Sequence, residues 1–374
     1  MSFSDLELKI IQKIDEDGPI TFEKFMNMAL YDPELGYYAS GKPRIGREGD
    51  FYTSSCLHPV FGTMIGKQLE EMWEIMGRPH DFAVLEMGAG PGYLCKDVLD
   101  SLKKRDIFSS LVYGIIERSP AMRETQKRFL GDFEGVVRWL PSLDEVGGAR
   151  GCLLSNELLD AFPVHLVQME DTWEEVYVSV EQGRLRESLG PLSDPAVADC
   201  LAGFSVERER GYRTEVNLRI RDWLCSAADA LAEGFVLTID YGYTARDYYS
   251  EDRNRGTLMC YYRHELVEDP LANVGEEDIT AHVNFSAVMK WGEDAGLGTI
   301  GFCGQGAYLI SLGIDGEIKR LASESEEYLF ELARIKKLIL PQGMGESHQV
   351  MIQYKGKDRP ELKGFKLRNR MKYL

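Results

Sequence analysis

The spacing of apolar residues divides the chain into helical and extended segments. Between residues 82 and 160, short apolar runs alternate with segments in which apolar residues recur every three or four positions. This alternation of strand and helix is typical of a parallel sheet with helices packed on its faces. The pattern predicts helices at about 92–105 and 119–130, and strands at 82–86, 111–117, 136–140 and 152–155.

The segments on either side of this alternation follow other patterns. Apolar residues at helical spacing precede a stretch rich in glycine and proline near the N-terminus, and a period-two alternation begins at residue 164. The chain ends in a basic run, either solvated or docked on the acidic body. We therefore expect five parts: a helical cap with an active-site loop (1–80), the first part of an α/β core (81–163), an antiparallel insert (164–233), the rest of the core with a loop-rich lid (234–354) and a basic tail (355–374).

The first predicted strand leads into a glycine-rich turn. Gly88, Gly90 and Gly92 follow the strand at every second position, and Leu94 begins a helical spacing. Strand, glycine turn and helix open a nucleotide-type site, because glycine places no Cβ between the backbone and a ligand. Tyr93 stands where the dinucleotide fingerprint has its third glycine, and no Lys-Ser/Thr pair follows for a triphosphate. Alternatively, the glycines only allow close packing of the helix.

Carboxylates at the ends of the first two strands narrow the class of ligand. Glu86 stands two residues before the first glycine and suits a ligand with a cationic amino group. S-adenosyl-L-methionine (SAM), which carries an ammonium and a sulfonium, fits this requirement. Glu117 ends the second strand, where a carboxylate can accept both ribose hydroxyls. The charge of Glu117 also suits the N-terminus of the following helix.

Further acidic residues follow two later strands. Glu157 and Asp160 are three residues apart, which would place them on one helical face, and Asp240 ends a buried strand. Asn156 either contacts the cofactor or caps the next helix. Because ligands of doubly wound sheets bind at the carboxyl ends of the strands, we expect these side chains to line the crevice where the cofactor's methyl group emerges.

Composition and charge narrow the function classes. The hydrophobic share of 44% is ample for a core, and no long apolar run predicts a membrane helix. The net charge of −18 disfavours nucleic-acid binding and suits a basic substrate, although an acidic surface also serves solubility. The seven cysteines and six histidines are scattered, so we expect reduced thiols and no metal site. The first residues carry no secretory or transit pattern, and a cytoplasmic location is expected.

Several blocks beyond the glycine motif resemble a known family, the SAM-dependent methyltransferases of the MidA type. The resemblance extends over nearly the whole chain. It departs from the common pattern at Ala89 and at Ser55-Cys56. The matching blocks are TFEKFMNMALYDPELGYY (21–38), GDFYTS (49–54), LEMGAGPGYL (85–94), SNELLDAFPV (155–164), LTIDYGY (237–243), RGTL (255–258), DITAHVNF (278–285) and LPQGMG (340–345).

The resemblance implies a class I methyltransferase core, a Rossmann-like doubly wound sheet, with SAM as the cofactor. Mitochondrial members of the family are complex I assembly factors that methylate arginine in a complex I subunit, so the resemblance implies an arginine-bearing protein as substrate. It also implies that a loop with Asp50 and Thr53 contributes to the cofactor site. Together with the segment that holds His282, this loop would close over the site. His282 is then either a proton acceptor or a structural residue.

Methylation of arginine requires groups that orient and activate its guanidinium. Arginine is a weak nucleophile because it is protonated, and carboxylates that grip two of its nitrogens direct the third at the methyl group. We hypothesise that Glu157 and Asp160, with Asp240 as a third candidate, fill this role. Two other classes stay open: a methyltransferase for a small molecule or another side chain, and a non-catalytic SAM-binding assembly protein. The sequence leaves the oligomeric state open, a homodimer included.

Overall fold

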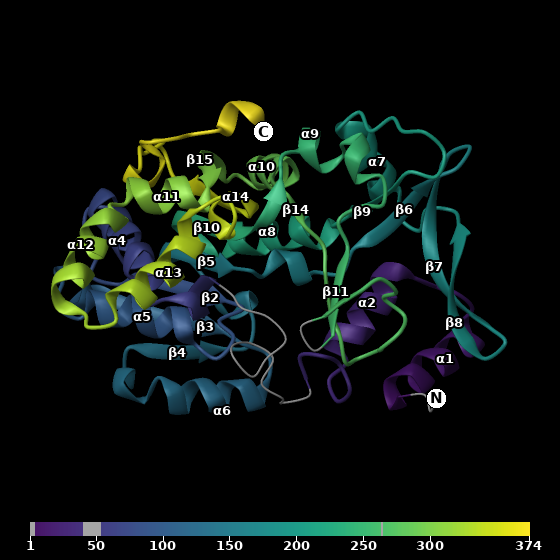
Figure 1. The fold of residues 1–374 in the computed structure, drawn as a ribbon, viewed down its shortest axis with the longest axis horizontal. Coiled ribbons are helices and arrows are strands. Elements are labelled where there is room, and N and C mark those ends of the chain that lie inside the picture. The colour runs from purple at the N-terminus through teal and green to yellow at the C-terminus, as the bar shows by residue number, and fades with distance from the viewer. Residues whose placement is uncertain (1–3, 40–53, 263–264) are drawn as a thin grey trace. The chain divides into compact units, whose positions relative to one another are not determined.

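The computed structural model describes residues 4–39, 54–262 and 265–374, which form two compact units (Figure 1). Asp50 and Thr53 lie outside the described residues. Unit 1 comprises Met1–Phe51, Leu159–Asp222 and Tyr243–Asn284. Unit 2 comprises Tyr52–Leu158, Trp223–Gly242 and Phe285–Leu374. The predicted cap is thus divided between the units, because the chain passes from one to the other after the first two helices.

Unit 2 is built on a mixed sheet whose strand order is β15-β16-β10-β5-β2-β3-β4. The five strands from β10 to β4 are parallel, and β16 runs antiparallel to both of its neighbours. The chain order reverses between β2 and β5, which is where a doubly wound sheet binds its ligand. The strands are β2 (Phe82–Met87), β3 (Leu111–Ile116), β4 (Val137–Leu140), β5 (Ala149–Asn156), β10 (Leu231–Tyr243), β15 (Gly298–Gly304) and β16 (His348–Lys355).

Helices bury their apolar faces in the core of unit 2. In α5, Leu94, Val98 and Leu102 are buried at helical spacing, and in α6 the Ser119 hydroxyl accepts from the backbone N–H of Met122. The predicted strands and both predicted helices of this region are confirmed. The helices that belong to unit 2 or run into it are α3 (Ser54–Leu57), α4 (Val60–Ile75), α5 (Tyr93–Leu102), α6 (Pro120–Phe129), α8 (Leu218–Ala230), α10 (Phe285–Asp294), α11 (Gln305–Ser311), α12 (Ile314–Glu324), α13 (Tyr328–Ile339) and α14 (Met344–Ser347).

Unit 1 contains the predicted antiparallel insert, and the N-terminal residues are part of the same fold. Its larger sheet has the order β1-β7-β6-β9 with β8 paired to β7, and a second sheet has the order β12-β11-β13. The elements are α1 (Asp5–Asp17), α2 (Phe22–Tyr31), α7 (Pro195–Gly203), α9 (Ala245–Tyr248), β1 (Ile20–Thr21), β6 (His165–Met169), β7 (Trp173–Glu181), β8 (Arg184–Gly190), β9 (Arg213–Val216), β11 (Met259–Tyr262), β12 (Glu265–Val267), β13 (Asp278–Thr280) and β14 (Val283–Asn284).

The basic C-terminal tail packs on unit 2. Leu362 and Phe365 are buried, and the Phe365 ring lies 5.5 Å from the ring of Tyr308. The backbone N–H of Arg370 donates to the carbonyl of Phe302. Of the two arrangements considered for the tail, the docked one is therefore observed.

Candidate functional site

The glycine turn joins β2 to α5 at the point where the strand order reverses. Gly88, Gly90 and Gly92 have φ angles of 76°, 51° and 97°, a backbone region that other residues rarely adopt. A Cβ on Gly88 would lie 2.9 Å from Cδ1 of Leu158, which shows that the end of β5 lies against this turn. Because these glycines carry no Cβ, no side chain of their own stands between the backbone of the turn and a ligand.

Glu86 lies inside unit 2, just before this turn. Glu86 is 2% exposed, and the Tyr113 hydroxyl donates a hydrogen bond to its Oε2 at 2.7 Å. Burial raises the pKa of Glu86 to about 7, and the hydrogen bond from Tyr113 opposes this rise. The contact between Glu86 and a cationic amino group stays a prediction.

Burial of Glu86 makes the stability of the protein depend on pH. The raised pKa means that the folded state binds the proton more tightly than the unfolded state, so stability is lost as the pH rises from the unfolded value of 4.5 to about 7. Glu86→Gln cannot ionise. Relative to the wild type, its free energy of unfolding is expected to rise by about 3 kcal/mol between pH 4.5 and 8.

Urea unfolding at several pH values measures this difference. The exposed Glu326→Gln serves as the control and is expected to run parallel to the wild type. A Glu86→Gln curve that also runs parallel to the wild type would show that Glu86 does not carry this pH dependence.

Glu117 follows β3 and is connected to the glycine turn. Its Oε1 accepts from the backbone N–H of Ser119 at 2.8 Å, and its Oε2 accepts from Nε2 of Gln126 at 3.3 Å. The same Gln126 nitrogen donates to the carbonyl of Gly90 at 2.7 Å. Burial raises the pKa of Glu117, and the hydrogen bonds that it accepts oppose the rise. Leu94 is 2% exposed and packs in the core, so its backbone is the part that can meet a cofactor.

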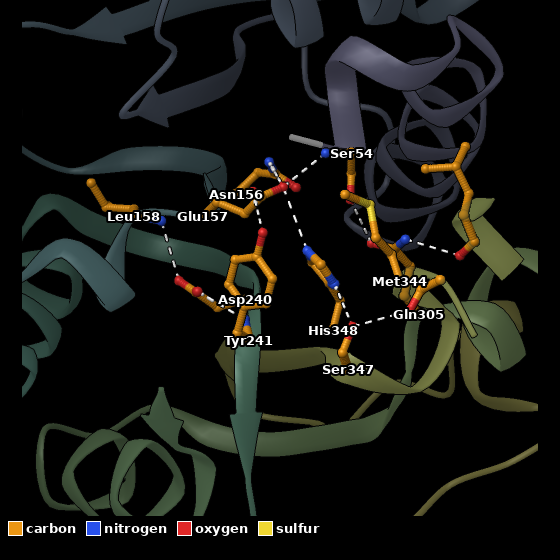
Figure 2. A network of polar contacts seen from close by, with 12 residues as sticks. Ser54, Asn156, Glu157, Leu158, Asp240, Tyr241, Gln305, Met344, Ser347 and His348 are labelled. Carbon is orange, nitrogen blue, oxygen red and sulfur yellow. Dashed lines mark hydrogen bonds and ion pairs between the residues drawn. The ribbon is translucent and has the colours of Figure 1, made fainter. Parts of the chain in front are cut away.

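Glu157 lies at the centre of a polar network at the carboxyl ends of β5 and β10 (Figure 2). Its Oε1 accepts from the backbone N–H of Ser54 at 2.8 Å and lies 3.7 Å from Nε2 of His348. The Tyr241 hydroxyl donates to Oε2 at 3.2 Å. The side chain is 3% exposed. Glu157 is therefore a buried carboxylate whose orientation is fixed by hydrogen bonds from Ser54 and Tyr241, with His348 beside it.

Asn156 and Asp240 belong to the same network. The side-chain nitrogen of Asn156 donates to Glu157 at 3.3 Å, while its Oδ1 has no hydrogen-bond partner among the described residues. Asp240 is fully buried, and its two oxygens accept from the backbone N–H groups of Leu158 and Tyr241 at 3.2 and 2.9 Å. Asp240 thereby ties the end of β5 to the end of β10.

The expectation that Glu157 and Asp160 share a helical face is wrong. Glu157 has a φ of 51° and its N–H donates to the carbonyl of Ile239, so the chain leaves β5 in a left-handed turn. Asp160 lies in a short 3₁₀ turn, Leu159–Ala161, that begins after Glu157 and belongs to unit 1. It is buried, and its carbonyl accepts from the N–H of Ala281.

His282 also belongs to unit 1. Its Nδ1 lies 3.3 Å from the carbonyl of Thr257, its N–H donates to the Thr257 hydroxyl, and its ring stacks on Tyr243 with centroids 5.2 Å apart. These contacts favour the structural alternative for this histidine.

The sequence does not predict two residues of the site, Gln126 and His348. Ser54 ends the block 49–54, which belongs to the loop expected to close over the site. Gln126 is a polar residue within a helical pattern, and His348 is the first residue of the buried strand β16. Neither position differs from an ordinary surface or core residue until the neighbouring elements are known. Over the described ranges, no three metal-type side chains lie together, and no helix is long and apolar enough to cross a membrane.

Comparison with known proteins identifies a family model, relatives and a solved structure that this chain resembles. A family model for S-adenosyl-L-methionine-dependent methyltransferases matches residues 64–303. The mitochondrial protein arginine methyltransferase NDUFAF7 of Bos taurus is 30% identical, over 90% of this chain and 80% of that protein. The Drosophila melanogaster homolog is 28% identical, over 92% of this chain and 83% of its own length. A Burkholderia thailandensis protein crystallised with S-adenosyl-homocysteine is 31% identical with a TM-score of 0.92, and covers 99% of this chain and 96% of its own.

Proposed function

This chain belongs to the S-adenosyl-L-methionine-dependent methyltransferase family of the MidA type, and from this premise we propose that it methylates arginine side chains of a protein. It is an enzyme with SAM as its cofactor. Relatives named protein arginine methyltransferases support arginine as the acceptor. The net charge of −18 also supports a basic substrate.

The cofactor residues that we propose are those of the glycine turn together with Glu117. The glycines of the turn place no Cβ between the backbone and a ligand, and Glu117 retains acceptor capacity for a ribose because each carboxylate oxygen carries two lone pairs. Bound SAM supplies an electrophilic methyl group on its sulfonium. Asn156, whose Oδ1 lacks a partner among the described residues, is a further cofactor contact in this proposal.

The observation that carries the proposal is the position of Glu157. It stands one residue before Leu158, whose side chain lies against Gly88, so a fixed carboxylate is adjacent to the proposed cofactor turn. In the proposed mechanism, Glu157 grips the guanidinium, holds one nitrogen toward the methyl group and accepts the proton that the nitrogen releases on methylation.

Asp240 has a different role in this mechanism. Asp240 is fully buried, unlike Glu117, and both of its oxygens accept backbone N–H groups, so we assign it to holding the Glu157 turn rather than to gripping substrate. The substrate contact expected of Asp160 stays a prediction from the sequence. As the family resemblance implies, the proposal includes a subunit of respiratory complex I as the substrate. It also keeps the cytoplasmic location expected from the sequence, although the named relatives are mitochondrial.

Transfer of labelled methyl groups tests the proposed acceptor. The purified protein is incubated with methyl-labelled SAM and a lysate of cells that lack it, and labelled material is identified by mass spectrometry. We expect label on arginine of a protein, and far less of it with Glu157→Gln in the same time. Label on a small molecule or on another side chain contradicts the arginine assignment. No label from protein that binds S-adenosylhomocysteine would indicate a non-catalytic binding protein.

A further inference from the structure

We infer that Gln126 is a positioning residue of the cofactor site, and that Trp139 orients it. Gln126 holds the glycine turn and Glu117 in one fixed arrangement by donating hydrogen bonds to both. This inference rests on the proposal that the turn and Glu117 bind SAM.

The burial of Gln126 is the first observation. Among the described residues of α6, Gln126 alone is buried, and its exposed fraction is 0%. A buried amide destabilises a protein unless its polar atoms are hydrogen-bonded. Both hydrogen atoms of the Gln126 amide can be used, one on the carbonyl of Gly90 at 2.7 Å and one on Oε2 of Glu117 at 3.3 Å. The two acceptors are in the two elements proposed to bind the cofactor.

Trp139 determines which way the amide points. The indole Nε1 of Trp139 donates to Oε1 of Gln126 at 3.0 Å. An indole N–H can only donate a hydrogen bond. If the Gln126 amide were flipped, its NH₂ group would face the N–H of Trp139, and its oxygen would face the acceptor oxygens of Gly90 and Glu117. Trp139 lies in β4, where it pairs with Ile115 of β3, the strand that Glu117 follows. The network thus connects the ends of β2 and β3 through β4 and α6.

This arrangement has a consequence for ribose binding. Ser119 and Gln126 each donate to a different oxygen of Glu117, so the plane of the carboxylate is fixed while each oxygen keeps a lone pair. Two neighbouring ribose hydroxyls need two such acceptors. Gln126 is a neutral donor, so it orients the Glu117 carboxylate without neutralising the negative charge as an ion pair would. The bond to Gly90 also holds that residue in its left-handed conformation, with a φ of 51°.

Calorimetric titration with S-adenosylhomocysteine tests the inference on the full-length protein. Gln126→Leu keeps the side-chain size but removes the donors, and we expect its Kd to rise about tenfold or more, the loss typical of hydrogen bonds to charged groups. Trp139→Phe removes the orienting donor and is expected to raise the Kd about threefold. The control is Thr125→Ala, an exposed neighbour on the same helix, which is expected to bind like the wild type.

A double-mutant cycle separates positioning from a general loss of stability. In a Glu117→Ala background, Gln126→Leu is expected to raise the Kd less than about threefold, because the bond to Glu117 is already gone and only the bond to Gly90 is left to lose. An undiminished effect in that background would overturn the inference, and so would wild-type affinity in folded Gln126→Leu. If Gln126→Leu does not fold, wild-type affinity in Trp139→Phe overturns the orienting role. Wild-type affinity in Glu117→Ala alone would instead contradict the proposed cofactor site.

Discussion

Glu157→Gln is expected to lower the rate of methyl transfer about 100-fold or more while the Kd for S-adenosylhomocysteine stays within about twofold, the loss typical of one preorganised electrostatic group. The substitution keeps the size of the side chain and one acceptor oxygen. It removes the negative charge that grips the guanidinium and the base that accepts its proton. The backbone turn survives, because Asp240 ties it through the N–H groups of Leu158 and Tyr241.

Single-turnover transfer of label to the arginine-bearing acceptor measures this effect. Tyr241→Phe is the matched control, since it removes only the hydroxyl that donates to Glu157 and keeps the carboxylate. We expect a loss of about tenfold or less, in keeping with one hydrogen bond. If Glu157→Gln turns over as fast as the wild type, Glu157 is not the group that activates the acceptor.

Gly90→Val is expected to abolish stabilisation by S-adenosylhomocysteine. Gly90 has a φ of 51°, and a β-branched residue in this region is strained. The new side chain would also stand in the turn where the cofactor's backbone contacts are proposed. For the wild type, ligand at about 100 times its Kd is expected to stabilise the folded state by about 2.7 kcal/mol, so the unfolding temperature should rise by several degrees.

Thermal unfolding with and without the ligand makes the comparison. Gly147→Val is the control, because nothing lies within 4 Å of a Cβ at that position. It should show the wild-type increase in unfolding temperature. An equal increase in Gly90→Val would mean that the ligand binds somewhere other than the glycine turn.

The elements of the parallel core could be predicted because their signals are local. Short apolar runs and helical spacing appear within a few residues, and β2, β3, α5 and α6 lie where these patterns indicate. Pairing between distant segments leaves no such signal. The short strand β1 pairs with β7. That contact makes the N-terminal residues part of unit 1. No feature of either segment's sequence predicts that the two strands pair.

The same distinction applies to the site. Acidic residues at strand ends could be found because the topology brings those ends to one edge of the sheet. The relative position of Glu157 and Asp160 could not be predicted, because it depends on the left-handed backbone conformation of Glu157, which a non-glycine residue rarely adopts. The negative charge of Asp240 suggested a substrate contact. Its burial and its two backbone hydrogen bonds, which are visible only in the structure, show that it supports the turn at Glu157.

A crystal structure of the complex with S-adenosylhomocysteine tests the central claim most directly. We expect the ligand to lie along the glycine turn of unit 2, with both ribose hydroxyls donating to Glu117 and with Gln126 keeping its bonds to Gly90 and Glu117. Ligand bound elsewhere, or a ribose out of hydrogen-bond distance of Glu117, would contradict this claim.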